Sequence, residues 1–199
     1  LDAARIMTVM ALDQGEKPAV VSAIVKYQLT ERMRQVINDA MDVHGGRGIC
    51  TGPRNYLARI YQGVPITITV EGANILTRSL IIFGQGAIRC HPYVLTEMRA
   101  ANDEDRQRGL RDFDAALFSH IGFSLSNVAR SLVLGLTGAR WVRTPGNGIV
   151  AHYYRQLTRT STSLALAADV VMVTLGGRLK RLERLSARLG DVLSYLYLA

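Results

Sequence analysis

The chain has 199 residues, 48% hydrophobic and 20% charged, a composition that is ordinary for a globular protein with a substantial core. Its formal net charge of +8 is spread over 10 basic and 7 acidic residues in 1–90 and 14 basic and 9 acidic residues in 91–199, without a basic run, which argues against a nucleic-acid-binding protein. The two cysteines, Cys50 and Cys90, lack the spacing of a disulfide framework, and the four histidines are too scattered to indicate a metal site.

Apolar residues recur at helical spacing along nearly the whole chain, which predicts an all-α protein. A first helix over residues 1–14 ends at Gly15, and a second begins at Pro18 and ends at Gly45-Gly46, so that the two form an antiparallel hairpin. Because the chain starts within an amphipathic pattern and without an initiator methionine, we expect it to be a fragment of a longer protein.

The pattern then changes twice. A short helix over residues 54–62 precedes residues 66–70, whose alternating Ile, Thr and Val predict an extended segment. Ala73 or Asn74 starts the next helix, which runs to about Ile88. We place the domain boundary at residue 90.

The second half begins with a polar stretch and continues as helices. Further helices are predicted over residues 110–139, 149–175 and 178–189. The most apolar window, Leu164–Leu175, is interrupted by Asp169 and predicts a buried helix, and no stretch has the length of a membrane span. We expect Trp141 and the pair Tyr153-Tyr154 to pack inside this region.

Glu71 is the first candidate for chemistry. It stands at the end of the predicted extended segment, next to Gly72 and just before a helix. Neighbouring apolar residues can desolvate a carboxylate there, and a glycine allows close approach of a ligand to the backbone, which together suit a general base. The alternative interpretation is that the Glu71 side chain is solvated or salt-bridged. For Arg78, on the helix that follows, a structural ion pair is as compatible with the sequence as a contact with a bound anion.

The glycines Gly45, Gly46 and Gly48 are the second candidate. A dinucleotide fingerprint requires a preceding strand, whereas a helix precedes this cluster, so it is not a Rossmann motif. The glycines either end the helix and form a turn, or they bring backbone amides close to a nucleotide.

These elements resemble the C-terminal helical domain of acyl-CoA dehydrogenases in their order. The matching features are the helical hairpin, Gly-Gly-x-Gly, the Glu71-Gly72 pair and Arg78 seven residues after the glutamate. The resemblance covers residues 1–90. The sequence VEGANILTRSLIIFGQGA and the helical continuation over residues 91–199 look most like the long bacterial acyl-CoA dehydrogenases of fatty-acid β-oxidation, which carry a C-terminal extension.

The resemblance implies a role for each matched residue. Glu71 is the base that removes the α-proton of a fatty acyl-CoA, while the β-hydrogen leaves as hydride to FAD and trans-2-enoyl-CoA forms. Gly72 leaves room for the substrate. Gly45 and Gly46 contact the ADP part of FAD, commonly one that a neighbouring subunit holds.

The resemblance also implies partners, namely an electron-transfer acceptor protein and further copies of the chain in a homo-oligomer. The spread of charge along the chain predicts no nucleic-acid partner. Members of the family work in the cytoplasm or at the inner membrane, which a protein of this kind can reach peripherally or through segments outside this chain. The fragment alone is expected to be inactive, because the domains that supply most flavin contacts have no counterpart in it.

Three positions depart from the family pattern. Asp42, Ala73 and Ile75 stand where many members have Gln, a hydroxyl residue and an amide, which affects the detailed FAD contacts. Some relatives also place the base on an earlier helix, which would precede residue 1.

The alternative is a non-catalytic helical module for interaction or assembly. Residues 91–199 fit it better than they fit an active site, because no acids, histidines or nucleophiles converge there in the sequence. We expect this extension to support the catalytic domain, to mediate assembly, or both.

Overall fold

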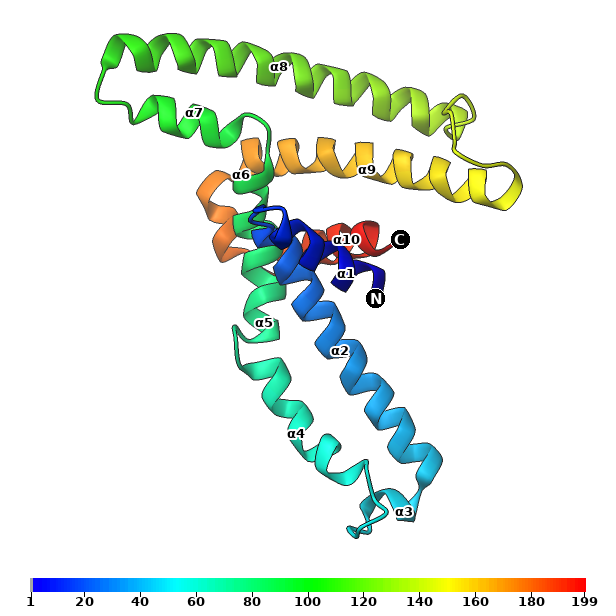
Figure 1. The fold of residues 1–199 in the computed structure, drawn as a ribbon. Helices are drawn as coiled ribbons and strands as arrows, with labels where there is room; N and C mark the ends of the chain where they lie inside the picture. Colours follow the sequence, from blue (N-terminus) through cyan, green and yellow to red (C-terminus); the bar gives the residue numbers. More distant parts are fainter. Residues whose placement is uncertain (1) are drawn as a thin grey trace. The chain divides into compact units, whose positions relative to one another are not determined.

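A computed structural model describes residues 2–199, and every regular element in this range is a helix (Figure 1). The all-α prediction is confirmed. The chain divides into two compact units, residues 1–82 and 83–199, and each unit is described by itself.

The first unit begins with the predicted hairpin. Helix α1 (Asp2–Asp13) is followed by Gly15, whose φ of +80° allows the chain to turn, and α2 (Ala19–His44) starts directly after Pro18. Ile24 and Val25 form the buried part of α2, which packs against α4 (Ala58–Thr69). The short helix α3 (Gly46–Ile49) connects the end of α2 to the loop before α4.

The extended segment predicted over residues 66–70 is wrong, because α4 continues through Gly63 and Pro65 to Thr69. The hydroxyl groups of Thr67 and Thr69 donate to the backbone carbonyls of Val64 and Pro65, an arrangement available only on a helix. Five residues of alternating pattern are too few to separate a strand from a helix. Val70 alone is extended.

The helix predicted to start at Asn74 is confirmed and ends at Cys90. It consists of α5 (Asn74–Leu76), a π-helical segment η1 (Thr77–Gln85) and α6 (Gly86–Cys90). The division between the two units lies within η1.

The second unit contains two long helices. These are α8 (Arg106–Thr137) and α9 (Gly148–Leu175), preceded by the unpredicted α7 (Val94–Ala101) and followed by η2 (Gly176–Arg181) and α10 (Glu183–Leu198). Both α7 and α9 pack against α8 (Figure 1).

The ends of these helices refine the predictions. The side chain of Asp105 caps α8 by accepting from the backbone N–H groups of Gln107 and Arg108, so that α8 starts before residue 110. The single helix predicted over residues 178–189 is wrong, because the chain breaks at Leu182 between η2 and α10.

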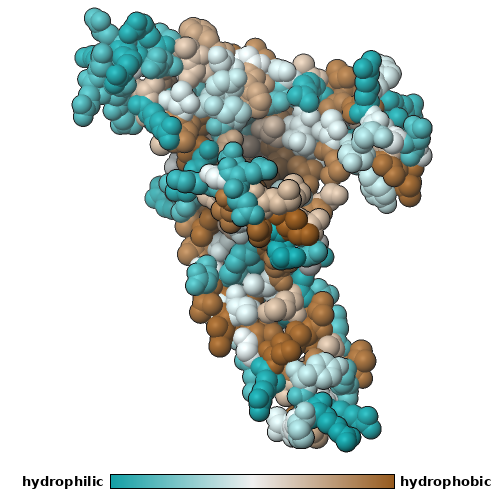
Figure 2. Space-filling model, in the orientation of Figure 1, coloured by the Kyte–Doolittle hydropathy of each residue, from teal (hydrophilic) through white to brown (hydrophobic). Residues whose placement is uncertain are grey.

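Many large apolar side chains are exposed, and Figure 2 shows hydrophobic residues, in brown, at the surface among hydrophilic ones. Trp141 is 79% exposed and Tyr153 61% exposed, so the expectation that they pack inside the second region is wrong. On α8 a stripe of Phe118, Ile121, Leu125, Val128 and Leu132 is exposed at alternating spacings of three and four residues. Exposed apolar surfaces of this kind are typical of sites of interaction.

The stretch Gly148–Arg181 is long and apolar enough to cross a membrane by length and composition, contrary to the sequence prediction. The helices Ala58–Thr69 and Asn74–Cys90 also meet this criterion, but only when taken together across a bend of 42°. Within Gly148–Arg181, Asp169 is buried and bonded to side chains of the same unit.

Candidate functional site

Glu71 and Gly72 form the turn between α4 and α5, and both have left-handed backbone conformations. The φ angles are +57° at Glu71 and +88° at Gly72. Within residues 2–199, Ala139 is the other non-glycine residue with positive φ. A non-glycine residue in this region is strained, and such strain is concentrated at functional sites. The side chain of Glu71 is exposed, so the apolar surroundings expected for it are not supplied by this unit.

Gly72 is explained by its backbone. A Cβ atom at this position would lie 3.7 Å from Oγ1 of Thr77, an ordinary contact, so space does not require glycine here. The φ of +88° requires glycine, because residues with a side chain rarely adopt this backbone conformation. The predicted role of Gly72, which is to leave room for a substrate, stays a prediction.

Polar side chains connect this turn to α2. Nζ of Lys26 donates to the carbonyl oxygen of Gly72 at 2.8 Å and to Oδ1 of Asn74 at 2.7 Å. The amide nitrogen of Asn74 donates to Thr30 and Glu31, both at 2.9 Å. Sequence analysis missed these contacts, since the residues are more than 40 positions apart and form no motif.

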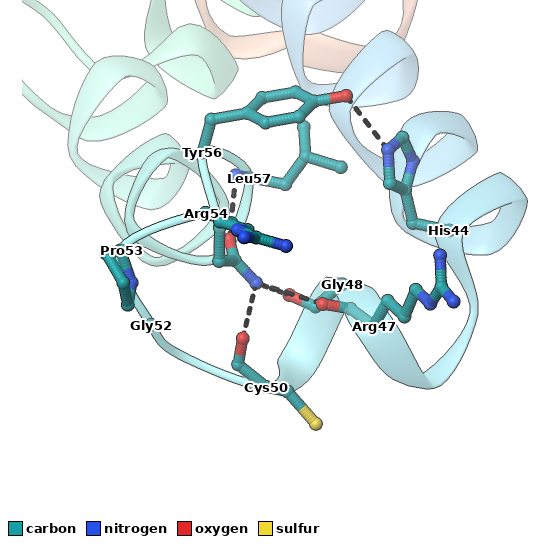
Figure 3. A pocket seen from close by; sticks show the side chains of 10 residues that line it. His44, Arg47, Gly48, Cys50, Gly52, Pro53, Arg54, Tyr56 and Leu57 are labelled. Carbon is teal, nitrogen blue, oxygen red and sulfur yellow. Dashed lines mark hydrogen bonds between the residues drawn. The ribbon is translucent and has the colours of Figure 1, made fainter.

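The glycine cluster lies beside a pocket of about 590 Å³ (Figure 3). Its lining includes Arg47 and Arg54, together with Tyr56, whose hydroxyl group is 2.8 Å from Nε2 of His44. Asn55 shapes the loop by donating to the carbonyl oxygens of residues 47, 48 and 50, and it accepts from the backbone N–H groups at the start of α4. The two guanidinium groups make the lining suitable for a phosphate-bearing ligand.

At two of the three positions the structure of the chain itself explains why the residue is a glycine. Gly45 ends α2 with a φ of +54°. Gly48 is buried, and a Cβ atom there would lie 3.1 Å from Sδ of Met41. At Gly46 an added Cβ would meet nothing within 4 Å. Gly46 is thus the position at which the absence of a side chain is left unexplained by this unit.

The structure does not bring Glu71 and the glycine cluster together. The pocket lies at the N-terminal end of α4 and Glu71 follows its C-terminal end. The 12 residues of α4 span about 18 Å. Any common function of the two candidates therefore requires an extended ligand or two separate ones.

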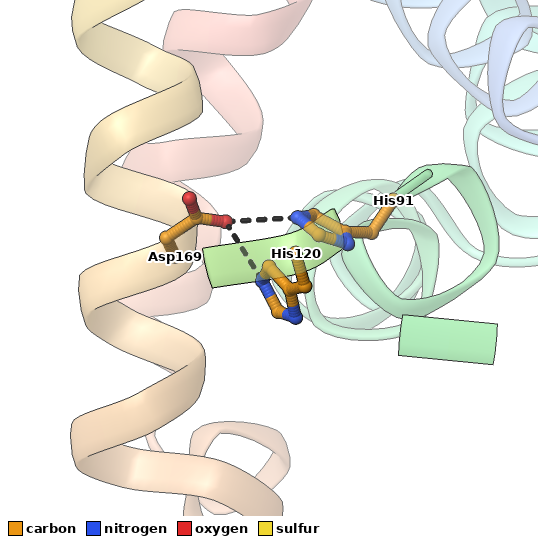
Figure 4. Close-up of side chains that lie close together, drawn as sticks. All are labelled: His91, His120 and Asp169. Carbon is orange, nitrogen blue, oxygen red and sulfur yellow. Dashed lines mark hydrogen bonds and ion pairs between the residues drawn. The ribbon is translucent and has the colours of Figure 1, made fainter. Parts of the chain in front are cut away.

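A third group of side chains was not predicted. His91, His120 and Asp169 converge in the second unit, with their ligand atoms within 4.8 Å of one another (Figure 4). The histidines are scattered in the sequence, and their spacing did not predict that two of them meet beside an acid in the fold. Asp169 is buried, and Nε2 of His91 lies 2.8 Å from its Oδ1.

The hydrogen bonds of His91 fit a polar network better than a metal centre. Its Nδ1 accepts from the backbone N–H groups of Tyr93 and Val94, both at 3.2 Å, so the ring hydrogen is on Nε2 and points to Asp169. A metal ion at Nε2 would require a hydrogen on Nδ1, facing those two donors. Metal-binding histidines instead donate from the second nitrogen to an acceptor.

The network joins three helices. Oδ2 of Asp169 on α9 accepts from the hydroxyl group of Ser124 on α8 at 2.7 Å. Nδ1 of His120 on α8 donates to Glu97 on α7 at 2.8 Å, and its Nε2 lies 3.7 Å from Asp169. The lone acid within an apolar window was the one sequence signal for this cluster, because such an acid requires buried partners.

Comparison with known protein families assigns nearly all of the chain. A family model described as "Acyl-CoA dehydrogenase, C-terminal domain" matches residues 1–84. A second, described as "Acyl-CoA dehydrogenase, C-terminal, bacterial type", matches residues 88–199. No solved structure matches the chain.

Proposed function

The chain belongs to the acyl-CoA dehydrogenase family, and from this premise we propose that it is the C-terminal part of an enzyme that converts a fatty acyl-CoA to trans-2-enoyl-CoA in fatty-acid β-oxidation. Family membership indicates a flavin-dependent oxidoreductase of all-α C-terminal fold. In this proposal Glu71 is the base. The observation that carries the proposal is the strained left-handed backbone of Glu71, followed by that of Gly72.

The position of Glu71 suits proton removal from a bound ligand. Glu71 is exposed at the turn, so that a substrate held by other domains of the enzyme can reach its carboxylate. The carboxylate takes the α-proton of the thioester, which the neighbouring carbonyl group acidifies. A bound FAD would supply the hydride acceptor for the β-hydrogen. The two C–H bonds are broken, a C=C bond forms, and the acyl chain is oxidised by two electrons.

The glycine cluster fits the ADP part of FAD in its chemistry. Arg47 and Arg54 supply positive charge to the pocket, and the open side of Gly46 allows close approach to the backbone. The assignment of Gly45 and Gly46 to cofactor binding rests on the family pattern, since Gly48 is the glycine of this cluster that lines the pocket. The separation of about 18 Å along α4 is compatible with an FAD held by a neighbouring subunit, and therefore with a homo-oligomer.

The electron acceptor and the location are part of the same proposal. An electron-transfer acceptor protein reoxidises the flavin. The enzyme works in the cytoplasm, and further segments of the parent protein can associate it with the inner membrane.

A helical interaction module is the second candidate, for residues 91–199. It is favoured by the exposed stripe of Phe118, Ile121, Leu125, Val128 and Leu132, whose spacing is that of helices that pack against another helix. Removal of residues 91–199 from the parent enzyme is expected to lower solubility or to change the oligomeric state. A truncated enzyme with the same solubility, oligomeric state and turnover would exclude this role.

Product analysis tests the catalytic proposal. The full-length enzyme, incubated with a long-chain acyl-CoA and an artificial electron acceptor, is expected to form trans-2-enoyl-CoA. Glu71→Gln should form almost none, while Glu16→Gln, which changes an exposed glutamate after α1, should match the wild type. Equal product from wild type and Glu71→Gln would contradict the assignment of the base.

A further inference from the structure

The carbonyl group that follows Glu71 is held by a side chain from α2. Lys26 donates to the Gly72 oxygen at 2.8 Å, and the same ammonium group donates to Oδ1 of Asn74 at 2.7 Å. A single cation thus fixes the turn at Gly72 and the first residue of α5. The two acceptors are neutral oxygens, so the ammonium group acts here as a hydrogen-bond donor to the backbone and to an amide.

Asn74 is fixed in turn. It is 4% exposed, and its amide group donates to Oγ1 of Thr30 and to Oε1 of Glu31, both at 2.9 Å. Both amide hydrogens and the carbonyl oxygen therefore have partners. Rotation of this side chain would leave buried polar groups unpaired, which is costly, so the network has one stable arrangement.

The turn requires such a restraint. Glu71 with a φ of +57° is in a conformation that a glutamate in a free loop rarely adopts. Strained backbone conformations persist only where the surrounding contacts determine them. The contacts of Lys26 and Asn74 lie directly after Glu71 and supply this determination from the neighbouring helix.

We propose that Lys26 and Asn74 are positioning residues that hold the Glu71–Gly72 turn, and with it the Glu71 carboxylate, in place for proton removal. This inference rests on the proposed role of Glu71 as the base. Neither residue touches the substrate in this account. Both act through the backbone that carries the base.

The test uses the full-length flavin-loaded enzyme with Lys26→Met, which keeps the length of the side chain and removes the donor. Lys17→Met, in the linker between α1 and α2, is the matched control. For Lys26→Met the rate of anaerobic flavin reduction by bound acyl-CoA is expected to fall about 10- to 100-fold, because a small displacement of a reacting group has an effect of this size. The dissociation constant of the acyl-CoA should change little, and Lys26→Arg should recover part of the rate.

Hydrogen exchange provides a readout that is independent of turnover. Backbone amides of residues 72–77 should exchange faster in Lys26→Met than in Lys17→Met, while those within α1 should be unchanged. Asn74→Asp loses the donors to Thr30 and Glu31, and it is expected to show the same slower flavin reduction and faster amide exchange. It replaces Lys26→Met in the test if that variant does not fold. Flavin reduction and exchange equal to the control in both variants would overturn the inference.

Glu71→Gln, measured in parallel, separates failure of the inference from failure of the proposed function. If Glu71→Gln reduces the flavin at the wild-type rate, the proposed base is wrong and the positioning role falls with it. If Glu71→Gln is inactive and Lys26→Met reduces the flavin at the rate of Lys17→Met, the base stands and the positioning role is overturned.

Discussion

Removal of the Asp169 carboxylate should destabilise the second unit strongly. Its side chain is 6% exposed and accepts from Nε2 of His91 and from Oγ of Ser124 at 2.8 and 2.7 Å. In Asp169→Ala both donors lose their partner within the unit. Each unpaired buried donor costs about 1–3 kcal/mol, so that the two together cost about 2–6 kcal/mol. We expect a loss of about 2–6 kcal/mol in the free energy of unfolding.

Asp169→Asn should be much milder. The amide oxygen can accept from His91, and the amide nitrogen can donate to Ser124, because a hydroxyl group both donates and accepts. The expected loss is about 1 kcal/mol, the net value of one ordinary hydrogen bond. Both variants remove the negative charge of the side chain, but only Asp169→Ala removes both hydrogen bonds. The difference between their free energies of unfolding therefore measures the contribution of the two hydrogen bonds.

Urea unfolding of the 199-residue chain, followed by far-UV circular dichroism, measures both values as shifts in midpoint at constant slope. Asp114→Ala, on an exposed face of α8, is the matched control and should change the free energy by less than about 0.5 kcal/mol. An Asp169→Ala variant as stable as Asp114→Ala would refute the argument that this network holds α7, α8 and α9 together.

Three further predictions concern the backbone and one ion pair. Arg108, which donates to Asp103, lowers the pKa of that carboxyl group, with help from the backbone N–H of residue 105. This pair therefore contributes stability above pH 3.8 that is lost as the pH falls through the lowered pKa, and Arg108→Met should raise the pKa of Asp103 toward 3.8 in an NMR titration. Gly109→Ala should cost about 1–3 kcal/mol in urea unfolding, because its Cβ would lie 2.6 Å from the carbonyl oxygen of residue 100, whereas Gly122→Ala, where space is open, should be neutral or stabilising. Gly72→Ala should lower the melting temperature because of its φ of +88°, with a cost of about 1–2 kcal/mol, and an unchanged value would contradict the strain at this turn.

Long periodic segments were predictable from the sequence. The hairpin of α1 and α2, the helix starting at Asn74, and the two long helices of the second unit all extend over enough turns for the apolar spacing to decide. The alternating run over residues 66–70 was too short for its spacing to decide, and it forms the end of α4 up to Thr69.

The local chemistry at the turn was only partly predictable. Glu71 next to Gly72 marked a turn, yet the left-handed conformation of Glu71 is found beside contacts with α2 that no local pattern contains. The bonds between Lys26 and Gly72, and between His91 and Asp169, join residues 46 and 78 positions apart. Such contacts depend on how helices pack, which a single sequence does not specify.

Exposure was mispredicted for a related reason. Trp141 and Tyr153 are large and apolar, so burial was the natural expectation, and both are exposed. Apolar residues that contact another segment or a partner have the same local sequence pattern as residues of a core. The sequence signal is identical in the two cases, and only the packing distinguishes them.

Anaerobic bleaching of the flavin by a long-chain acyl-CoA, in the full-length enzyme and in Glu71→Gln, tests directly whether Glu71 is the base. Bleaching is expected in the wild type and should be lost in Glu71→Gln, with acyl-CoA binding retained in both. Bleaching at equal rates in the two proteins would contradict the account, because proton removal would then not depend on Glu71.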